Sequence, residues 1–202
     1  MTEERLEAQL RFLSEVDRLK TVERQSPIAD RSRRENSAEH SWHLAVCALI
    51  LGGLGERVDL GRVIAMLLIH DIVEIDAGDH PLHSDASDAF ATAAAERASA
   101  VRIFGLLPQD QATHLIDMWS EFEAAASPEA RFAKCLDRFQ PLMLNILAGG
   151  GTWTMNSVTE EQVQNRYGPA IQGGAPLLWA KAAQMVSKHF KSVRDTTADC
   201  PT

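Results

Sequence analysis

The stretch AMLLIHDIVE, residues 65–74, decides how the rest of the chain is interpreted. Its first half is apolar and is typical of a buried helix, and the ionisable residues His70, Asp71 and Glu74 follow. On a helix, Glu74 lies about one turn after the other two. Burying such groups costs several kcal/mol unless each finds a partner. A divalent metal ion suits an adjacent His and Asp, so we expect a metal site here. A capped helix end with a core His is the simpler alternative for the dipeptide alone.

Length and composition favour a single globular domain. The chain has 202 residues, of which 45% are hydrophobic, enough to bury one core. We expect one domain over residues 1–202, with an ordered core from about 3 to 193 and a frayed tail after Asp195. The net charge of −8 argues against a polymeric nucleic-acid partner, which requires a basic surface.

Cysteine usage and hydropathy indicate the compartment. The chain has three cysteines, Cys47, Cys135 and Cys200, which are widely spaced and odd in number. This pattern favours a reducing environment without a disulfide framework. No apolar run approaches the roughly 18 residues of a membrane span, and the N-terminus lacks the apolar core of a signal peptide. These features predict a cytoplasmic protein that does not enter the membrane.

Apolar residues recur at helical spacing through most of the chain, and strand patterns are nearly absent, so the predicted fold class is all-α. A first helix is expected over Glu3–Leu19, followed by a loop over Thr21–Arg34. The loop is basic through Arg24, Arg31, Arg33 and Arg34, at least one of which could meet an anionic ligand.

Capping signals place the remaining helices. Asn36 with Glu39 forms a capping box for a helix that carries His40 on its apolar stripe. Asp59 caps the helix that continues through Glu74. The further expected elements are helices over 85–104 and 109–122, one opened by Ser127-Pro128, a loop over 149–153, a short helix capped by Thr159 and Gln162, and a last helix over 175–193.

The order His40, His70-Asp71 and Asp137 resembles the HD-domain metal-dependent phosphohydrolases. The surrounding motifs are ENSAEHS at 35–41, HDIVE at 70–74 with Gly78-Asp79, and KCLDR at 134–138. Together they are similar to the 5′-deoxynucleotidase branch of that family, the YfbR-like proteins. The resemblance covers nearly the whole chain and implies a single-domain HD-domain helical bundle.

The resemblance also implies a ligand set and a reaction. His40, His70, Asp71 and Asp137 would bind one divalent ion, and this donor set suits Mn, Co, Fe, Zn or Ni. Glu74 resembles the catalytic acid/base that orients or deprotonates the attacking water. The implied activity is hydrolysis of (deoxy)nucleoside 5′-monophosphates to nucleoside and phosphate.

Two substrate contacts and an oligomeric state follow from the same resemblance. Asp79 resembles the residue that hydrogen-bonds the deoxyribose, and Arg24 resembles the phosphate-binding Arg. In the bacterial enzymes a Trp that contributes to sugar selection follows this Arg, whereas Gln25 follows it here. The habit of the family implies a homodimer.

Other interpretations of these residues remain open. Taken alone, His40 fits a hydrogen-bonded core residue, Asp137 an acid paired with Lys134 or Arg138, and Asp79 a turn residue. The alternative functions are an HD phosphohydrolase acting on a cyclic nucleotide, a triphosphate or an alarmone, a non-catalytic helical metal-binding module, and a di-metal oxygenase.

Two features bear on these alternatives. Alarmone hydrolases of this family carry a Glu-Asp pair after the dyad, whereas Ile75 follows Glu74 here, which argues against that substrate. His80, His83 and His114 are not expected to take part in the site, although they could supply ligands for a second metal ion.

Overall fold

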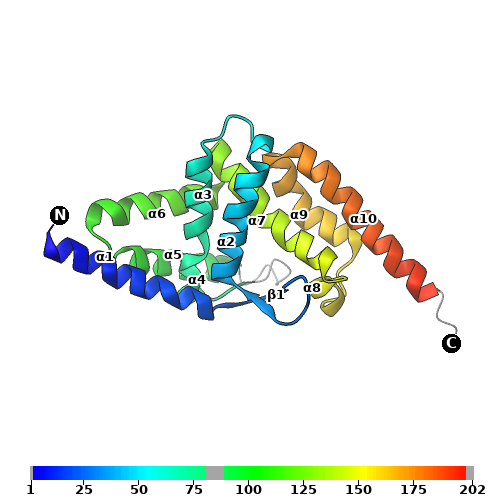
Figure 1. The fold of residues 1–202 in the computed structure, drawn as a ribbon, viewed down its shortest axis with the longest axis horizontal. Helices are drawn as coiled ribbons and strands as arrows, with labels where there is room; N and C mark the ends of the chain where they lie inside the picture. The colour runs from blue at the N-terminus through cyan, green and yellow to red at the C-terminus, as the bar shows by residue number, and fades with distance from the viewer. Residues whose placement is uncertain (1, 81–88, 199–202) are drawn as a thin grey trace.

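A computed structural model of the chain describes residues 2–80 and 89–198. Within them the structure is helical, with short 3-10 turns and one small sheet (Figure 1), which confirms the all-α expectation. In chain order the elements are α1 (Glu3–Val16), η1 (Asp17–Thr21), β1 (Glu23–Pro27), β2 (Arg34–Asn36), α2 (Ser37–Leu51), η2 (Gly52–Leu54), α3 (Leu60–Ile69), η3 (His70–Val73), α4 (Glu74–Ala77), α5 (Ala89–Phe104), α6 (Gln109–Ala124), α7 (Pro128–Leu147), α8 (Gly151–Met155), α9 (Glu160–Gly174) and α10 (Pro176–Ala198).

The helices form two groups on either side of α2 and α3. In Figure 1, α1, α5 and α6 lie on one side and α7 to α10 on the other. The larger core joins α2 and α3 to α7, α9 and α10 through residues such as Leu44, Met66, Leu136, Ile171 and Val186. The smaller core lies among α1, η3, α5 and α6 and includes Phe12, Ile72, Ile103, Phe104 and Trp119. Ile69, at the end of α3, packs against both cores.

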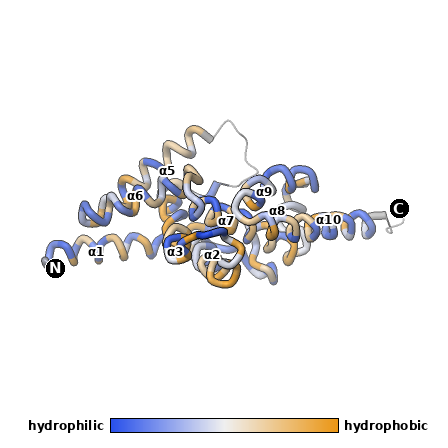
Figure 2. Tube along the Cα trace, turned by 90° about the horizontal axis from the view of Figure 1, so that it is seen from above, coloured by the Kyte–Doolittle hydropathy of each residue, from blue (hydrophilic) through white to orange (hydrophobic). Residues whose placement is uncertain are grey.

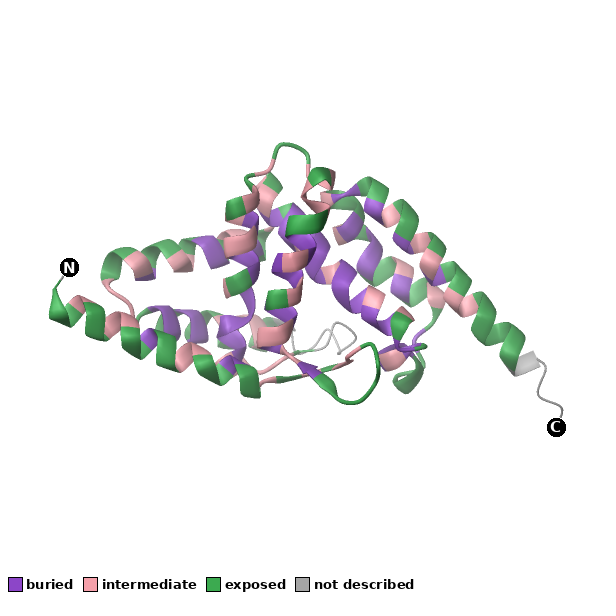
Figure 3. Cartoon of the chain, in the orientation of Figure 1, coloured by how far each residue is buried: buried purple, intermediate pink, exposed green. Residues whose placement is uncertain are grey.

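Burial follows the inner faces of the central helices. Figure 3 shows buried residues along α2, α3 and α7, whereas Figure 2 shows a largely hydrophilic end of α10 that projects from the rest. The last helix continues to Ala198, beyond the expected end at 193. No helix among residues 2–80 and 89–198 is long and apolar enough to cross a membrane.

The helix starts predicted from capping residues are confirmed. Both hydrogen bonds of the Asn36–Glu39 capping box are present at the start of α2. Ser127 caps α7 with Pro128 at its first position, and Thr159 forms a capping box at α9, which is longer than expected. These local signals work because they depend only on the first turn of each helix.

Two expected loops contain regular structure. The segment 21–34 includes β1, which pairs antiparallel with β2 so that Glu23 lies opposite Asn36 and Pro27 opposite Arg34. These strands are short and polar, so they carry no alternating pattern that a sequence could reveal. The expected loop at 149–153 is replaced from Gly151 onward by α8, which packs against α7 and β1.

The helix expected to run continuously through Glu74 changes form at the His-Asp dyad. Here α3 ends at Ile69, and a 3-10 turn (η3) carries His70 and Asp71 before α4 begins at Glu74. Because a 3-10 turn has about three residues, it keeps Asp71 and Glu74 on one side. Gly78, with φ of 79°, then ends α4, a conformation that favours glycine. Residues 81–88, which include His83, Pro81 and the start of the expected helix 85–104, lie outside the described chain, as does Cys200.

Part of the apolar face of α1 is exposed, whereas Val16 at its end packs against the smaller core. Leu6, Leu10 and Leu13 are 45–62% exposed, and Phe12 is the buried residue of this helix. Leu6, Leu10 and Leu13 line an apolar groove between α1 and α6. The helical spacing was therefore predicted correctly, although α1 ends at Val16, before the expected end at Leu19, and three of its leucines remain largely exposed.

Candidate metal centre and its pocket

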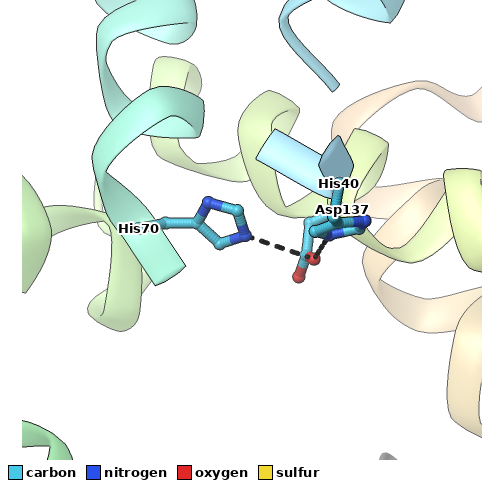
Figure 4. A group of neighbouring side chains, drawn as sticks. All are labelled: His40, His70 and Asp137. Atoms are coloured by element: carbon cyan, nitrogen blue, oxygen red, sulfur yellow. Dashed lines mark hydrogen bonds and ion pairs between the residues drawn. The ribbon is translucent and has the colours of Figure 1, made fainter. Parts of the chain in front are cut away.

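Three buried side chains from separate helical segments meet at the centre of the molecule. They are His40 in α2, His70 in η3 and Asp137 in α7, and one ligand atom of each lies within 4.8 Å of the others. His40 Nε2 is 3.2 Å from Asp137 Oδ1, and His70 Nε2 is 3.6 Å from the same oxygen (Figure 4). Such a group could hold a metal ion.

Asp71, the fourth ligand expected from the sequence, lies beside this group but is not one of the three residues whose ligand atoms all lie within 4.8 Å of one another. Its Oδ1 is 2.9 Å from His70 Nε2, and its Oδ2 is 3.9 Å from His40 Nε2. The structure therefore brings two imidazoles and two carboxylates to one place. Although burial alone would raise it, the charge of His70 lowers the pKa of Asp71 to about 2, so this carboxylate is ionised.

The hydrogen bonds of both histidines turn their Nε2 atoms toward the carboxylates. His70 Nδ1 lies 2.8 Å from the carbonyl oxygen of Leu67, and His40 Nδ1 lies 3.0 Å from Gln140 Oε1. In a neutral imidazole, an N–H at Nδ1 leaves the lone pair at Nε2, where a metal ion binds. His70 Nε2 is buried without a hydrogen bond of good geometry. This orphaned atom and the donor set fit a divalent ion.

Gln140 holds His40 through a buried network. Its Nε2 donates to Glu35 Oε1 at 2.7 Å and lies 3.1 Å from His43 Nδ1. Gln140 lies three residues after Asp137, so both occupy one face of α7. The sequence reasoning assigned no role to Gln140 or Glu35. A polar residue in an otherwise buried segment, one turn from a candidate ligand, is the signal that could have found Gln140.

Glu74 lies beside the ligand set with one oxygen already bound. Ser37 Oγ, at the start of α2, donates to Glu74 Oε2 at 2.5 Å. Burial and the charge of Asp71 raise the pKa of Glu74 to about 9. A carboxyl group with this pKa holds its proton at neutral pH unless positive charge accumulates beside it.

Arg24 supplies positive charge to a cluster of acids. From β1, its Nη1 lies 2.9 Å from Asp71 Oδ2, 3.4 Å from Asp79 Oδ1 and 3.8 Å from Glu74 Oε1. Its Nε lies 3.8 Å from Glu35 Oε2. Arg24, which was expected to bind phosphate, therefore lies on the β1–β2 hairpin, an element that was not expected from the sequence.

A polar pocket opens beside this cluster. It is lined by Arg24, Gln25, Ser26, Asp79, His80, Arg138, Pro141, Thr152, Asn156 and Tyr167. Of the four arginines in the basic segment, only Arg24 contributes to it. His80, one of these lining residues, is exposed, with Nε2 3.0 Å from the carbonyl oxygen of Ala77, and His114 lines the groove between α1 and α6. Neither histidine joins the metal-binding group within the described residues.

The fold and this constellation define a family. The family model described as "HD domain" matches residues 16–179, so the chain belongs to the HD-domain family. The resemblance inferred from the motifs is thereby confirmed.

Among the curated proteins to which the chain is similar are several 5′-deoxynucleotidases. The chain is 30% identical to the 5′-deoxynucleotidase HDDC2 of Homo sapiens over 135 residues, which cover 66% of this chain and 65% of that protein. It is 25% identical to the 5′-deoxynucleotidase hdd1 of Schizosaccharomyces pombe over 64% of this chain and 66% of that protein. The chain thus spans slightly less than two thirds of the length of these curated relatives.

Solved structures agree with the fold. A predicted metal-dependent phosphohydrolase from Magnetospirillum magnetotacticum is 46% identical and superposes with a TM-score of 0.88, covering 94% of this chain and 97% of that one. An HD-domain phosphohydrolase from Listeria innocua, 14% identical, superposes with a TM-score of 0.60 over 91% of this chain and 99% of that one, and supports the fold alone.

Proposed function

We propose that this protein is a metal-dependent phosphohydrolase that converts nucleoside 5′-monophosphates, deoxynucleotides preferred, to nucleoside and phosphate. The observation that carries the proposal is the convergence of two imidazole Nε2 atoms and two carboxylates beside Glu74. The names of the curated relatives support the substrate class. The structural relative supports metal dependence.

In this proposal His40, His70, Asp71 and Asp137 hold one divalent ion. The bound ion would lower the pKa of water and offset charge on the phosphate oxygens. Two imidazoles and two carboxylates suit Mn, Co, Fe, Zn or Ni. Arg24 lies among the carboxylates of Asp71, Glu74 and Asp79, so its positive charge disfavours a second cation at these acids. This favours one ion over two and argues against the di-metal oxygenase.

Glu74 is the proposed acid/base. Its Oε2 accepts the hydrogen bond from Ser37, which leaves Oε1 to accept a proton from the attacking water. The divalent ion that Asp71 would help to hold would lower the pKa of Glu74 and favour its ionised form, whereas burial raises that pKa. The protonated carboxyl group could then return its proton to the leaving 5′-oxygen.

The pocket provides the proposed substrate contacts. Asp79 lines it and would accept a hydrogen bond from a sugar hydroxyl, while Arg24 would contribute positive charge toward the phosphate. Gln25 lines the same pocket, and a glutamine amide can hydrogen-bond either sugar. Because Gln25 does not by itself select one sugar, preference for deoxyribose is tested by comparing the rate of phosphate release from each deoxynucleotide with that from its ribonucleotide.

A phosphate-release panel tests the proposal. The purified chain is assayed on deoxy- and ribonucleoside monophosphates, including dAMP and dTMP, with Mn, Co, Fe, Zn and Ni in turn. We expect phosphate release that is abolished by EDTA and by Asp71→Ala. Absence of turnover on every monophosphate with each ion would overturn it. Release of pyrophosphate or triphosphate from other nucleotides would instead identify another HD phosphohydrolase, and metal binding without any turnover would identify a binding module.

We also propose that the protein is a cytoplasmic homodimer. Cys47 and Cys135 are free thiols, as expected in a reducing compartment. Exposed apolar side chains on α2, among them Trp42 and Ile50, together with the exposed leucines of α1, offer surface for a second copy. Light scattering tests the oligomeric state, and a monomeric mass at micromolar concentration would refute the dimer.

A further inference from the structure

Arg138, which follows the metal-ligand candidate Asp137 on α7, lines the same pocket as Arg24 and Asp79. We infer that Arg138 is a phosphate-binding residue that contacts the phosphate group of the substrate and of the inorganic product. This inference rests on the proposed function, because it assigns one residue of the same site.

The two oxygens of Asp137 face different partners. Oδ1 lies 3.2 Å from His40 Nε2 and 3.6 Å from His70 Nε2, whereas Oδ2 lies 3.3 Å from Arg138 Nη1. Arg138 therefore stands next to the candidate ligand set without entering it. A group bound by this guanidinium would lie close to the centre where we propose that the reaction occurs.

The guanidinium of Arg138 has more N–H donors available to a ligand than that of Arg24. The side chain of Arg138 is 31% exposed, and its contact with Asp137 is its only ion pair among the described residues. The side chain of Arg24 is 12% exposed, and its Nη1 is shared by Asp71, Glu74 and Asp79. An incoming anion would have to compete with four carboxylates for Arg24, those of Glu35, Asp71, Glu74 and Asp79, but with one for Arg138.

The charge of the site favours such a donor. The cluster has five acidic side chains: Glu35, Asp71, Glu74, Asp79 and Asp137. A phosphate dianion approaching them is repelled unless cations in the pocket offset their charge. A guanidinium presents five N–H donors in a planar fork. It can therefore keep Asp137 on one nitrogen and bind phosphate oxygens through the others.

Phosphate binding by the metal-loaded full-length chain tests the inference. Inorganic phosphate is titrated calorimetrically into the wild type, Arg138→Met and Arg138→Lys, with metal content measured in each. The matched control is Arg131→Met, because Arg131 is exposed two turns earlier on α7 and donates to the carbonyl oxygen of Ala126.

We expect Arg138→Met to weaken phosphate binding by about tenfold or more. Arg138→Lys should retain part of the affinity, and Arg131→Met should match the wild type. In turnover assays Arg138→Met should raise KM more than it lowers kcat. Wild-type phosphate affinity in both Arg138 variants, measured at saturating metal, would overturn the inference, as would an equal loss in Arg131→Met.

The titration separates this inference from the proposed function. Phosphate binding that depends on Arg138 without turnover of any nucleotide would refute the proposed reaction and support the phosphate site. Nucleotide turnover with wild-type phosphate binding in the Arg138 variants would refute only the site.

Discussion

Replacing Gln140 by Leu removes the support of a candidate metal ligand without touching the ligand itself. The substitution deletes the acceptor of His40 Nδ1 at 3.0 Å and the donor to Glu35 at 2.7 Å. Gln140 is fully buried, so the groups left behind have no water to bind. Leaving a buried polar group without its partner costs about 1–3 kcal/mol, so the chain should lose about 2–4 kcal/mol of stability. The loss of ligand orientation should weaken metal binding by about 10- to 100-fold.

Competition with a fluorescent chelator measures the metal affinity, and urea unfolding measures the stability. Val186→Ala provides a control, because Val186 is fully buried in α10 and its truncation costs stability by leaving a cavity. This control should lower stability while leaving metal affinity unchanged. Metal affinity of Gln140→Leu within about twofold of the wild type would refute the positioning role. An equal loss of metal affinity in Val186→Ala would assign the effect to lost stability.

Further predictions concern the proton balance, the catalytic group and helix packing. Against the effect of burial, the charge of Asp71 raises the pKa of His70 to about 10 in the metal-free chain, so metal binding must displace a proton. The apparent affinity for the metal ion should rise by up to about tenfold per pH unit as the pH increases toward 10. Calorimetry in two buffers should detect the proton released from His70. A metal affinity that does not change with pH would contradict this prediction. Glu74→Gln should lower kcat by about 10²- to 10⁴-fold with metal content unchanged, and retained turnover would exclude the acid/base role. Gly174→Ala should lower the melting temperature, since its Cβ would lie 2.5 Å from both Arg131 O and Cys135 Cβ, whereas Gly173→Ala meets nothing within 4 Å and should not.

The candidate ligands and the helix starts could be predicted because their signals are local. The His70-Asp71 dyad ends an apolar helix, and Asn36 caps the helix that carries His40 one turn further on. Such patterns depend on residues within one or two turns, so the sequence displays them directly. The motif order was then enough to identify the family, which the family model confirms.

Several decisive contacts could not be predicted. Gln140 reaches His40 across 100 residues because α7 packs against α2, and it reaches Glu35 across 105 because β2, which carries Glu35, leads directly into α2. The turn at His70 takes a 3-10 form although its sequence continues a helical pattern. Propensity is a weak guide where tertiary contacts select the final geometry.

The sequence by itself determined the helical class of this protein, the segments that carry its ionisable residues and the family to which it belongs, because periodicity, capping and motif order are local. Only the tertiary structure decided which acids surround Arg24, which oxygen of Asp137 faces Arg138, and that Leu6, Leu10 and Leu13 of α1 remain exposed. Those outcomes depend on how distant segments pack, and the energy of packing belongs to pairs of surfaces rather than to any single stretch of chain.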